Sequence, residues 1–203
     1  MELKSGRGSS YRVASVTALG LPNEMGTLSS SISAQQARNI REAVPFASFI
    51  KLPLDLFVTI QWSKATPGNR VQIRLLRFFE RAYQWLFRRL VTLTYVYVHE
   101  IGTLGSHNSH VMIHMPQRFR KQFESMIPQW LDSPSCEGFI EVKPVEERDG
   151  LVEYFLKGTD VKAAKALGIL QCSDQGKIQG KRCGTSENIG RKARAQLRGR
   201  AAR

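Results

Sequence analysis

The sequence is poor in acidic residues and in cysteine. Its 17 Asp and Glu residues oppose 30 Lys and Arg, which leaves a formal charge of +13 and a pI near 10.1. Such an excess favours an anionic partner, with nucleic acid first and a membrane surface second. The three cysteines form no Cys-x-x-Cys pair. This spacing argues against a zinc knuckle or a disulfide framework and suits a reducing cytoplasm.

Long apolar runs and a nucleotide-binding loop are also missing. The most apolar stretch, residues 71–93, is interrupted by charged side chains throughout and is unsuited to cross a bilayer. The first thirty or so residues lack the apolar centre of a secretory signal, so we expect a cytoplasmic protein without a membrane partner. No Gly-x-x-x-x-Gly-Lys-Ser/Thr loop occurs.

The sequence does contain an ordered series of strand and helix patterns between residues 51 and 170. Residues 54–62 are rich in β-formers, and residues 71–90 repeat apolar side chains at three- and four-residue steps with arginines opposite. We interpret those arginines as a solvated face in preference to a DNA-contact face. Further strands are predicted over 91–100, 107–115 and 138–144. A second helix is predicted over 117–131, and Pro128 would kink or end it. A third helix is predicted over 151–167, interrupted near Gly158 and ended by Gly168. This order predicts an α+β fold, an antiparallel sheet with helices packed on one face.

The two ends of the chain differ from this central domain. Residues 1–50 are interpreted as a poorly structured leader, in which 33–42 form a short helix or an arm that orders on binding. From residue 171 the sequence becomes basic and rich in glycine, which predicts a flexible tail over 171–203. The tail either keeps the protein soluble or binds phosphates, and its charge density favours phosphate binding. The candidate nucleic-acid contacts in it are Lys177, Lys181, Arg182, Arg191, Lys192 and Arg194.

The predicted hairpin carries a candidate metal site. Glu100 ends its first strand, and Asn108 and His110 share one face of its second strand. A carboxylate, a side-chain carbonyl and an imidazole suit a hard divalent ion. Residues four apart on a strand are about 13 Å apart, so His114 cannot join His110 without a bulge, and His107 can join only through the turn. The alternative is that these histidines are half-buried structural residues.

A second candidate pair lies on the last predicted helix. Tyr154 and Lys157 are three residues apart and so share a helix face. A tyrosine hydroxyl is a poor nucleophile at its ordinary pKa near 10, but a neighbouring ammonium or a metal-bound phosphate makes attack more accessible. The alternative is a tyrosine at the edge of the core with a solvent-exposed lysine beside it.

Taken in order, these segments resemble the HUH endonuclease family of rolling-circle replication initiators and relaxases. Phe-Val-Thr-Ile-Gln-Trp at 57–62 is similar to the first motif of the family, and Tyr154-Phe-Leu-Lys157 is similar to its Tyr-x-x-Lys motif. Glu100 followed by Asn108-Ser-His110 resembles the metal motif, with Asn108 where the family has its first histidine. The segment at 180–190 is also similar to bacterial proteins of this layout. The resemblance covers residues 52 to 190.

The resemblance implies an HUH or RRM-like core that nicks and joins single-stranded DNA at a replication origin. Mg²⁺ or Mn²⁺ would be held by Glu100, His110 and Asn108. Tyr154 would form a 5′-phosphotyrosine, with Lys157 offsetting the phosphate charge. A host helicase and polymerase would be partners in a bacterial cytoplasm, for a plasmid or another mobile element. The competing hypothesis is a non-catalytic nucleic-acid-binding protein with a degenerate site, although the aromatic Lys/Arg-Gly-Phe/Tyr strand of RNA-recognition domains is absent.

Overall fold

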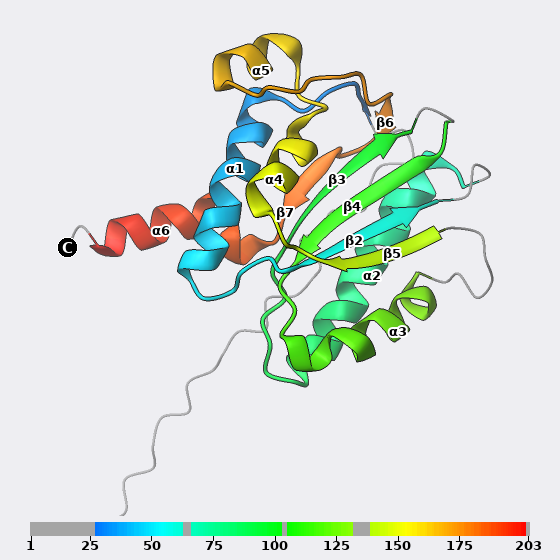
Figure 1. Ribbon diagram of the computed structural model, residues 1–203, viewed down its shortest axis with the longest axis vertical. Coiled ribbons are helices and arrows are strands. Elements are labelled where there is room, and N and C mark those ends of the chain that lie inside the picture. The colour runs from blue at the N-terminus through cyan, green and yellow to red at the C-terminus, as the bar shows by residue number, and fades with distance from the viewer. Residues whose placement is uncertain (1–26, 63–65, 103–104, 132–138, 202–203) are drawn as a thin grey trace, which may run out of the picture.

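A five-stranded antiparallel sheet forms the centre of the protein (Figure 1). The computed structural model describes residues 27–62, 66–102, 105–131 and 139–201. The strand order is β5-β2-β4-β3-β7. The strands are β2 (Leu56–Gln61), β3 (Tyr95–Ile101), β4 (His107–Ile113), β5 (Phe139–Pro144) and β7 (Cys183–Thr185). The antiparallel α+β prediction is therefore confirmed.

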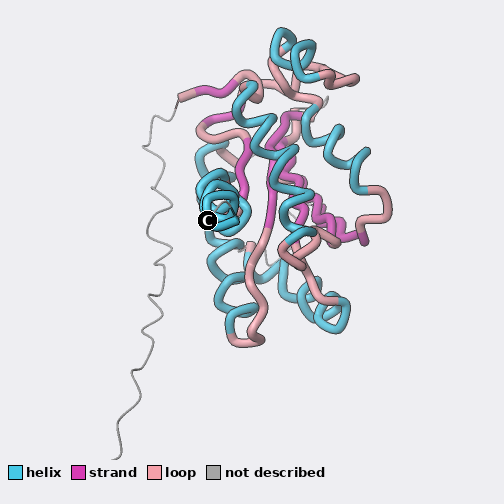
Figure 2. The backbone as a smooth tube through the Cα atoms, turned by 90° about the vertical axis from the view of Figure 1, so that its left-hand side faces the viewer, coloured by secondary structure: helices cyan, strands magenta, loops and turns pink. Residues whose placement is uncertain are grey.

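Helices cover both faces of this sheet, whereas the sequence analysis placed them on one face (Figures 1 and 2). One apolar core joins the sheet to α2 (Gly68–Phe87) and α3 (Arg120–Trp130). The other core joins the opposite face to α1 (Ala34–Phe49) and α4 (Arg148–Leu156). The physical reason lies in β3, whose first six residues are all buried. A strand buried on both sides has no polar face, so alternation of polarity cannot mark a single covered side.

Helix α1 lies inside the segment that was interpreted as an unstructured leader. Ser33 caps it: its hydroxyl accepts a hydrogen bond from the Gln36 amide, and the Gln36 side chain accepts one from the Ser33 amide. The helix buries Ala37, Ile40, Ala43, Val44 and Ala47. Small alanines at these core positions give a weak apolar signal, and Pro45 within the helix weakens it further. The short helix predicted over 33–42 is therefore present and extends to Phe49, whereas the prediction of a poorly structured leader is wrong for residues 34–49.

The predicted flexible tail is also folded into the protein. Its first strand, β6 (Ile178–Gln179), pairs with β1 (Leu28–Ser29), and β7 joins the edge of the central sheet beside β3. Gly184 of β7 allows close contact, because a Cβ atom there would lie 2.7 Å from Cε1 of Tyr97. The short helix η3 (Glu187–Ile189) and α6 (Arg191–Ala201) complete the chain.

The other predicted elements agree with the structure within a few residues. The last central helix divides into α4 and α5 (Val161–Leu167) on either side of Gly158, and Gly168 ends α5 with a φ of 65°. The short helix η2 (Gln117–Phe119) precedes α3, which continues past Pro128 to Trp130. In the described part of the chain, no helix has both the length and the apolar character that a membrane crossing requires.

Candidate active site

The strand register brings the predicted metal-site residues together. Glu100 of β3 pairs with Asn108 of β4, and His110 of β4 pairs with Thr59 of β2. Glu100, Asn108, His110 and Thr59 therefore project from the same face of three adjacent strands. This is the face that α4 partly covers, and Glu100 and His110 are 7 % and 4 % exposed.

Helix α4 brings Tyr154 and Lys157 to the same place. The Tyr154 hydroxyl lies 3.3 Å from Oε1 of Glu100 and 3.2 Å from Nε2 of His110. Those two atoms of Glu100 and His110 are themselves 3.0 Å apart. The Lys157 ammonium lies 2.7 Å from Oε2 of Glu100 and 3.8 Å from the centre of the Tyr154 ring. Residues 54 positions apart in the sequence thus form one compact cluster.

Glu100 is the electrostatic centre of the cluster. Burial raises the pKa of its carboxyl group, but the hydrogen bonds and charges of His110 and Lys157 outweigh burial and lower this pKa to about 2. Burial and the Glu100 charge raise the pKa of Tyr154 despite the opposing effect of Lys157. For Lys157, burial lowers the pKa, but the contacts with Glu100 and Tyr154 raise it overall. The cluster therefore holds a carboxylate, an ammonium and a neutral phenol near pH 7.

Thr59 and Phe57 hold the His110 imidazole in position. The Thr59 hydroxyl lies 3.2 Å from Nδ1 of His110, which leaves Nε2 directed at Glu100 and Tyr154. The Phe57 ring stacks on the imidazole at a centroid distance of 5.7 Å. A hydrogen bond to one ring nitrogen fixes the orientation of the other. The site analysis of the sequence did not include Thr59, although it lies within the 57–62 motif.

The donor set fits a hard divalent cation. An octahedral ion with ligands at about 2.1 Å places neighbouring ligand atoms about 3 Å apart, which agrees with the 3.0 Å between His110 Nε2 and Glu100 Oε1. Oδ1 of Asn108 is a buried carbonyl oxygen without a hydrogen-bond partner. Within the described ranges, no group of three or more His, Cys, Asp and Glu residues is placed to bind a metal, so Asn108 is the candidate for a third ligand.

Comparison with known proteins returned no match: no protein-family model, no curated protein and no solved structure is similar to this chain.

His107 and His114 do not contribute to the site. The His107 ring faces the opposite side of the sheet, 5.4 Å from the ring of His99. Nδ1 of His114 donates a hydrogen bond of 2.8 Å to the carbonyl of Pro53. The structure therefore gives no support to either histidine as a replacement for the missing first histidine of the metal motif.

Two of the six predicted nucleic-acid contacts are buried structural residues. Arg182 is 1 % exposed and donates to carbonyls of Ser29, His99, Gln175 and Gly176, which joins the C-terminal segment to β1 and β3. Arg194 is 4 % exposed and donates to carbonyl oxygens of Asn39 and Ile189. A DNA-contact role for these two arginines is therefore wrong.

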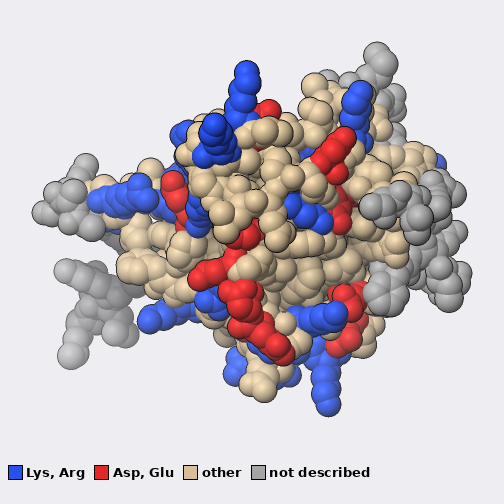
Figure 3. All heavy atoms as spheres, turned by 45° about the horizontal axis from the view of Figure 1, so that its top comes forward, with Lys and Arg blue, Asp and Glu red and all other residues tan. Residues whose placement is uncertain are grey.

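The other predicted contacts, Lys177, Lys181, Arg191 and Lys192, are exposed, and their role stays a prediction. Figure 3 shows basic side chains at many points of one face of the molecule, with acidic side chains between them. The positive charge is thus distributed over the surface and is not confined to the C-terminal segment.

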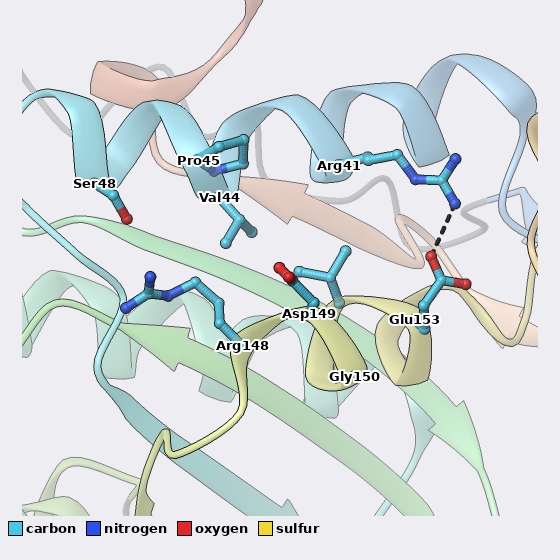
Figure 4. Close-up of a pocket in the computed structure, with 9 residues that line it drawn as sticks. Arg41, Val44, Pro45, Ser48, Arg148, Asp149, Gly150 and Glu153 are labelled. Carbon is cyan, nitrogen blue, oxygen red and sulfur yellow. Dashed lines mark hydrogen bonds and ion pairs between the residues drawn. The ribbon is translucent and has the colours of Figure 1, made fainter.

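A groove of about 550 Å³ separates α4 from α1 on the side away from the sheet (Figure 4). At one end, Arg41 of α1 forms an ion pair of 2.9 Å with Glu153 of α4 and also donates to the carbonyl of Leu167. Glu153 precedes Tyr154 in the chain. The Arg41 contacts therefore help to hold the turn of α4 that presents Tyr154 to the sheet.

Proposed function

We propose that this protein nicks and joins single-stranded DNA through Tyr154, with a divalent cation as cofactor. The observation that carries the proposal is the placement of the Tyr154 hydroxyl within 3.3 Å of both Glu100 and His110. A phenol, a carboxylate and an imidazole from separate elements meet here, in the order and spacing that the HUH endonuclease resemblance implies. A purely structural tyrosine would not need two ionisable partners at the end of a strand pair.

The reaction is a phosphoryl transfer. The Tyr154 oxygen forms a bond to phosphorus as the bond between phosphorus and the 3′ oxygen breaks, and the phenol proton ends on the released 3′-hydroxyl. The products are a 5′-phosphotyrosine and a free 3′ end, and the reverse reaction rejoins the strand. Lys157 is positioned to offset the negative charge of the phosphate, because its ammonium lies between Glu100 and the Tyr154 ring.

Glu100, His110 and Asn108 are the residues that would hold Mg²⁺ or Mn²⁺. When bound, such an ion supplies Lewis-acid polarisation of the scissile phosphate. Burial and the Glu100 charge disfavour the Tyr154 phenolate, and positive charge at this position would oppose both effects, which supports a role for a cation.

A second candidate function is nucleic-acid binding without cleavage. Asn108 favours it, since an amide oxygen is a weaker ligand than the histidine of the family motif. The surplus of basic side chains serves either function equally.

Formation of a covalent adduct distinguishes the two functions. The protein is incubated with origin-type single-stranded DNA and Mn²⁺, and the adduct is detected on a denaturing gel. We expect an adduct with the wild type, none with Tyr154→Phe, and the wild-type amount with Tyr83→Phe, because the α2 helix that carries Tyr83 packs on the opposite face of the sheet. Strong DNA binding by the wild type without any adduct would establish the non-catalytic function instead.

A further inference from the structure

Helices α2 and α3 lie on the face of the sheet opposite α4, which carries Tyr154 (Figure 1). A groove of about 500 Å³ lies between α2 and α3. Its walls are two tryptophans, two arginines, two glutamines and a methionine. No carboxylate is among these described lining residues. The groove therefore combines aromatic surface with positive charge, as proteins that bind single-stranded nucleic acid do.

The layer around this groove carries much of the positive charge of the protein. Residues 68–90 and 116–131 together contain nine Lys and Arg against two Glu, a net +7 within the chain total of +13. Arg120 is neutralised by an ion pair of 2.8 Å with Asp55. Arg88 is exposed at the edge of the groove. A polyanion bound in the groove would thus contact a cationic surface that extends beyond the groove.

The spacing of the groove residues along α2 suits a single-stranded nucleic acid, whose bases are free to stack. Arg81 and Arg88 are seven residues, or two helical turns, apart, which is about 10 Å. Gln84 and Trp85 lie between them on the same side of the helix. Arg81 is held in place by hydrogen bonds of 2.9 Å and 3.0 Å to the carbonyls of Gln129 and Trp130 in α3.

Trp85 is partly buried and makes edge-to-face contacts with Phe119, Phe123 and Trp130. The Arg89 guanidinium lies 3.7 Å from the centre of its ring and donates to the Trp85 carbonyl, which fixes the ring from one side. Trp130 is 6 % exposed and forms the deeper wall. Met126 adds a flexible apolar surface. Stacking on the Trp85 ring requires unpaired bases, so a single strand fits better than a duplex.

We propose that the α2–α3 groove is a second nucleic-acid-binding surface that binds single-stranded DNA. Phosphates lie between Arg81 and Arg88, a base stacks at Trp85, and the amides of Gln84 and Gln129 bind base edges. This binding does not depend on the Tyr154 chemistry. It would allow the protein to hold one part of a strand while another part lies at the candidate active site.

The test compares two double variants in the full chain. Arg88→Ala with Gln84→Ala removes the exposed contacts of the groove. Arg118→Ala with Gln117→Ala is the matched control, because it removes the same side-chain types from exposed positions of η2 in the same layer, outside the groove. Binding of a fluorescein-labelled 15-nucleotide oligothymidine is followed by anisotropy at several NaCl concentrations in EDTA, which prevents metal-dependent cleavage.

We expect the groove variant to bind about 10-fold more weakly, with a salt slope smaller by about 1, and the control to stay within about 2-fold of the wild type. The oligothymidine should also quench tryptophan fluorescence, and Trp85→Phe should remove most of that quenching. Equal weakening in both double variants would overturn the proposal, because it would indicate diffuse electrostatic attraction. Absence of oligothymidine binding, or binding of an acidic protein alone, would overturn it too. The Tyr154 adduct assay is scored separately, so either proposal can fail without the other.

Discussion

Strands β3 and β4 carry two sets of polar residues that alternate along the same backbone and face opposite cores. Glu100, Asn108 and His110 face the α4 side, where they meet Tyr154 and Lys157 from another element. The residues between them, His99, His107 and Ser109, face the α2 side, where His99 contacts Tyr97, His107 and Ser109. Both sets contain histidine, but only the α4-side set combines it with a carboxylate and with ionisable side chains from a helix.

The α2-side set is only partly hydrogen-bonded, because Nε2 of His99 and Nε2 of His107 are buried without a partner. The Trp62 indole donates a hydrogen bond of 2.7 Å to the Ser109 hydroxyl, which is also 2.7 Å from Nδ1 of His99. His99 is fully buried, and burial followed by the charges of His107 and Arg182 keeps its pKa well below the ordinary value. This histidine is therefore neutral and has a structural role. His110 differs from it in having a carboxylate and a phenol within 3.2 Å of its free ring nitrogen.

The sharpest test of this comparison replaces one histidine on each face of the sheet with glutamine. His110→Gln should reduce Tyr154 adduct formation by at least about 100-fold, because it removes a proposed ligand and the contact to the Tyr154 hydroxyl. His99→Gln should instead lower the free energy of unfolding by about 1–3 kcal/mol, because it disturbs a fully buried hydrogen bond. Adduct formation and urea unfolding are measured for both variants.

The results of the adduct assay and of urea unfolding have to be compared for both variants. Adduct formation by folded His99→Gln should stay within about 3-fold of the wild type, because His99 faces the α2 side and does not contact the reacting groups. Retained cleavage in His110→Gln together with lost cleavage in His99→Gln would reverse the assignment of the two faces.

The α2-side set also predicts an acid-sensitive stability. Burial, followed by the Arg182 charge, lowers the pKa of His107 from 6.5 to about 4. Between these values the unfolded chain binds more protons than the folded chain, so the free energy of unfolding rises with pH. The stability that is fully present above pH 6.5 is lost as the pH falls towards 4, by about 3 kcal/mol. Glu100 has the same sign in a lower window, from 4.5 down to about 2.

Urea unfolding at pH 7.0, 5.5 and 4.5 measures this effect. His107→Gln should reduce the dependence between pH 6.5 and 4.5, because the substituted side chain does not titrate. The slope that remains comes from His99, because burial keeps its pKa well below the ordinary value as well. A slope as steep as that of the wild type would place the acid sensitivity elsewhere in the protein.

The faces that carry the candidate site residues were predictable because strand and helix periodicities depend only on local sequence. Two-residue steps placed Asn108 and His110 on one face, and a three-residue step placed Tyr154 with Lys157. The covering of both sheet faces was harder to predict. It depends on α1, whose core residues include three alanines, and on β7, which is only three residues long. Arg182 could not be recognised as structural, because its acceptors are carbonyls of distant segments such as Ser29.

The smallest predicted effect is that of a substitution at Asn108. The α2 face of the sheet carries two histidines, whereas the α4 face carries one histidine, His110, and Asn108. Asn108→His would give the candidate metal site a second imidazole in place of an amide oxygen. Because imidazole is a softer ligand than a carbonyl oxygen, we expect the affinity for Mn²⁺ to rise about 10-fold and that for Mg²⁺ to rise less.

Isothermal titration calorimetry with each ion measures the affinities, and the adduct assay in Mn²⁺ should show faster cleavage by Asn108→His. Gln196→His is the control, because it adds a histidine at an exposed position of α6. Equal gains in the two variants would indicate nonspecific binding of the ion to surface histidines. Unchanged Mn²⁺ affinity in Asn108→His would show that the unpartnered carbonyl of Asn108 is not directed at an ion. The site would then retain only Glu100 and His110 as ligands, and the non-catalytic function would be favoured.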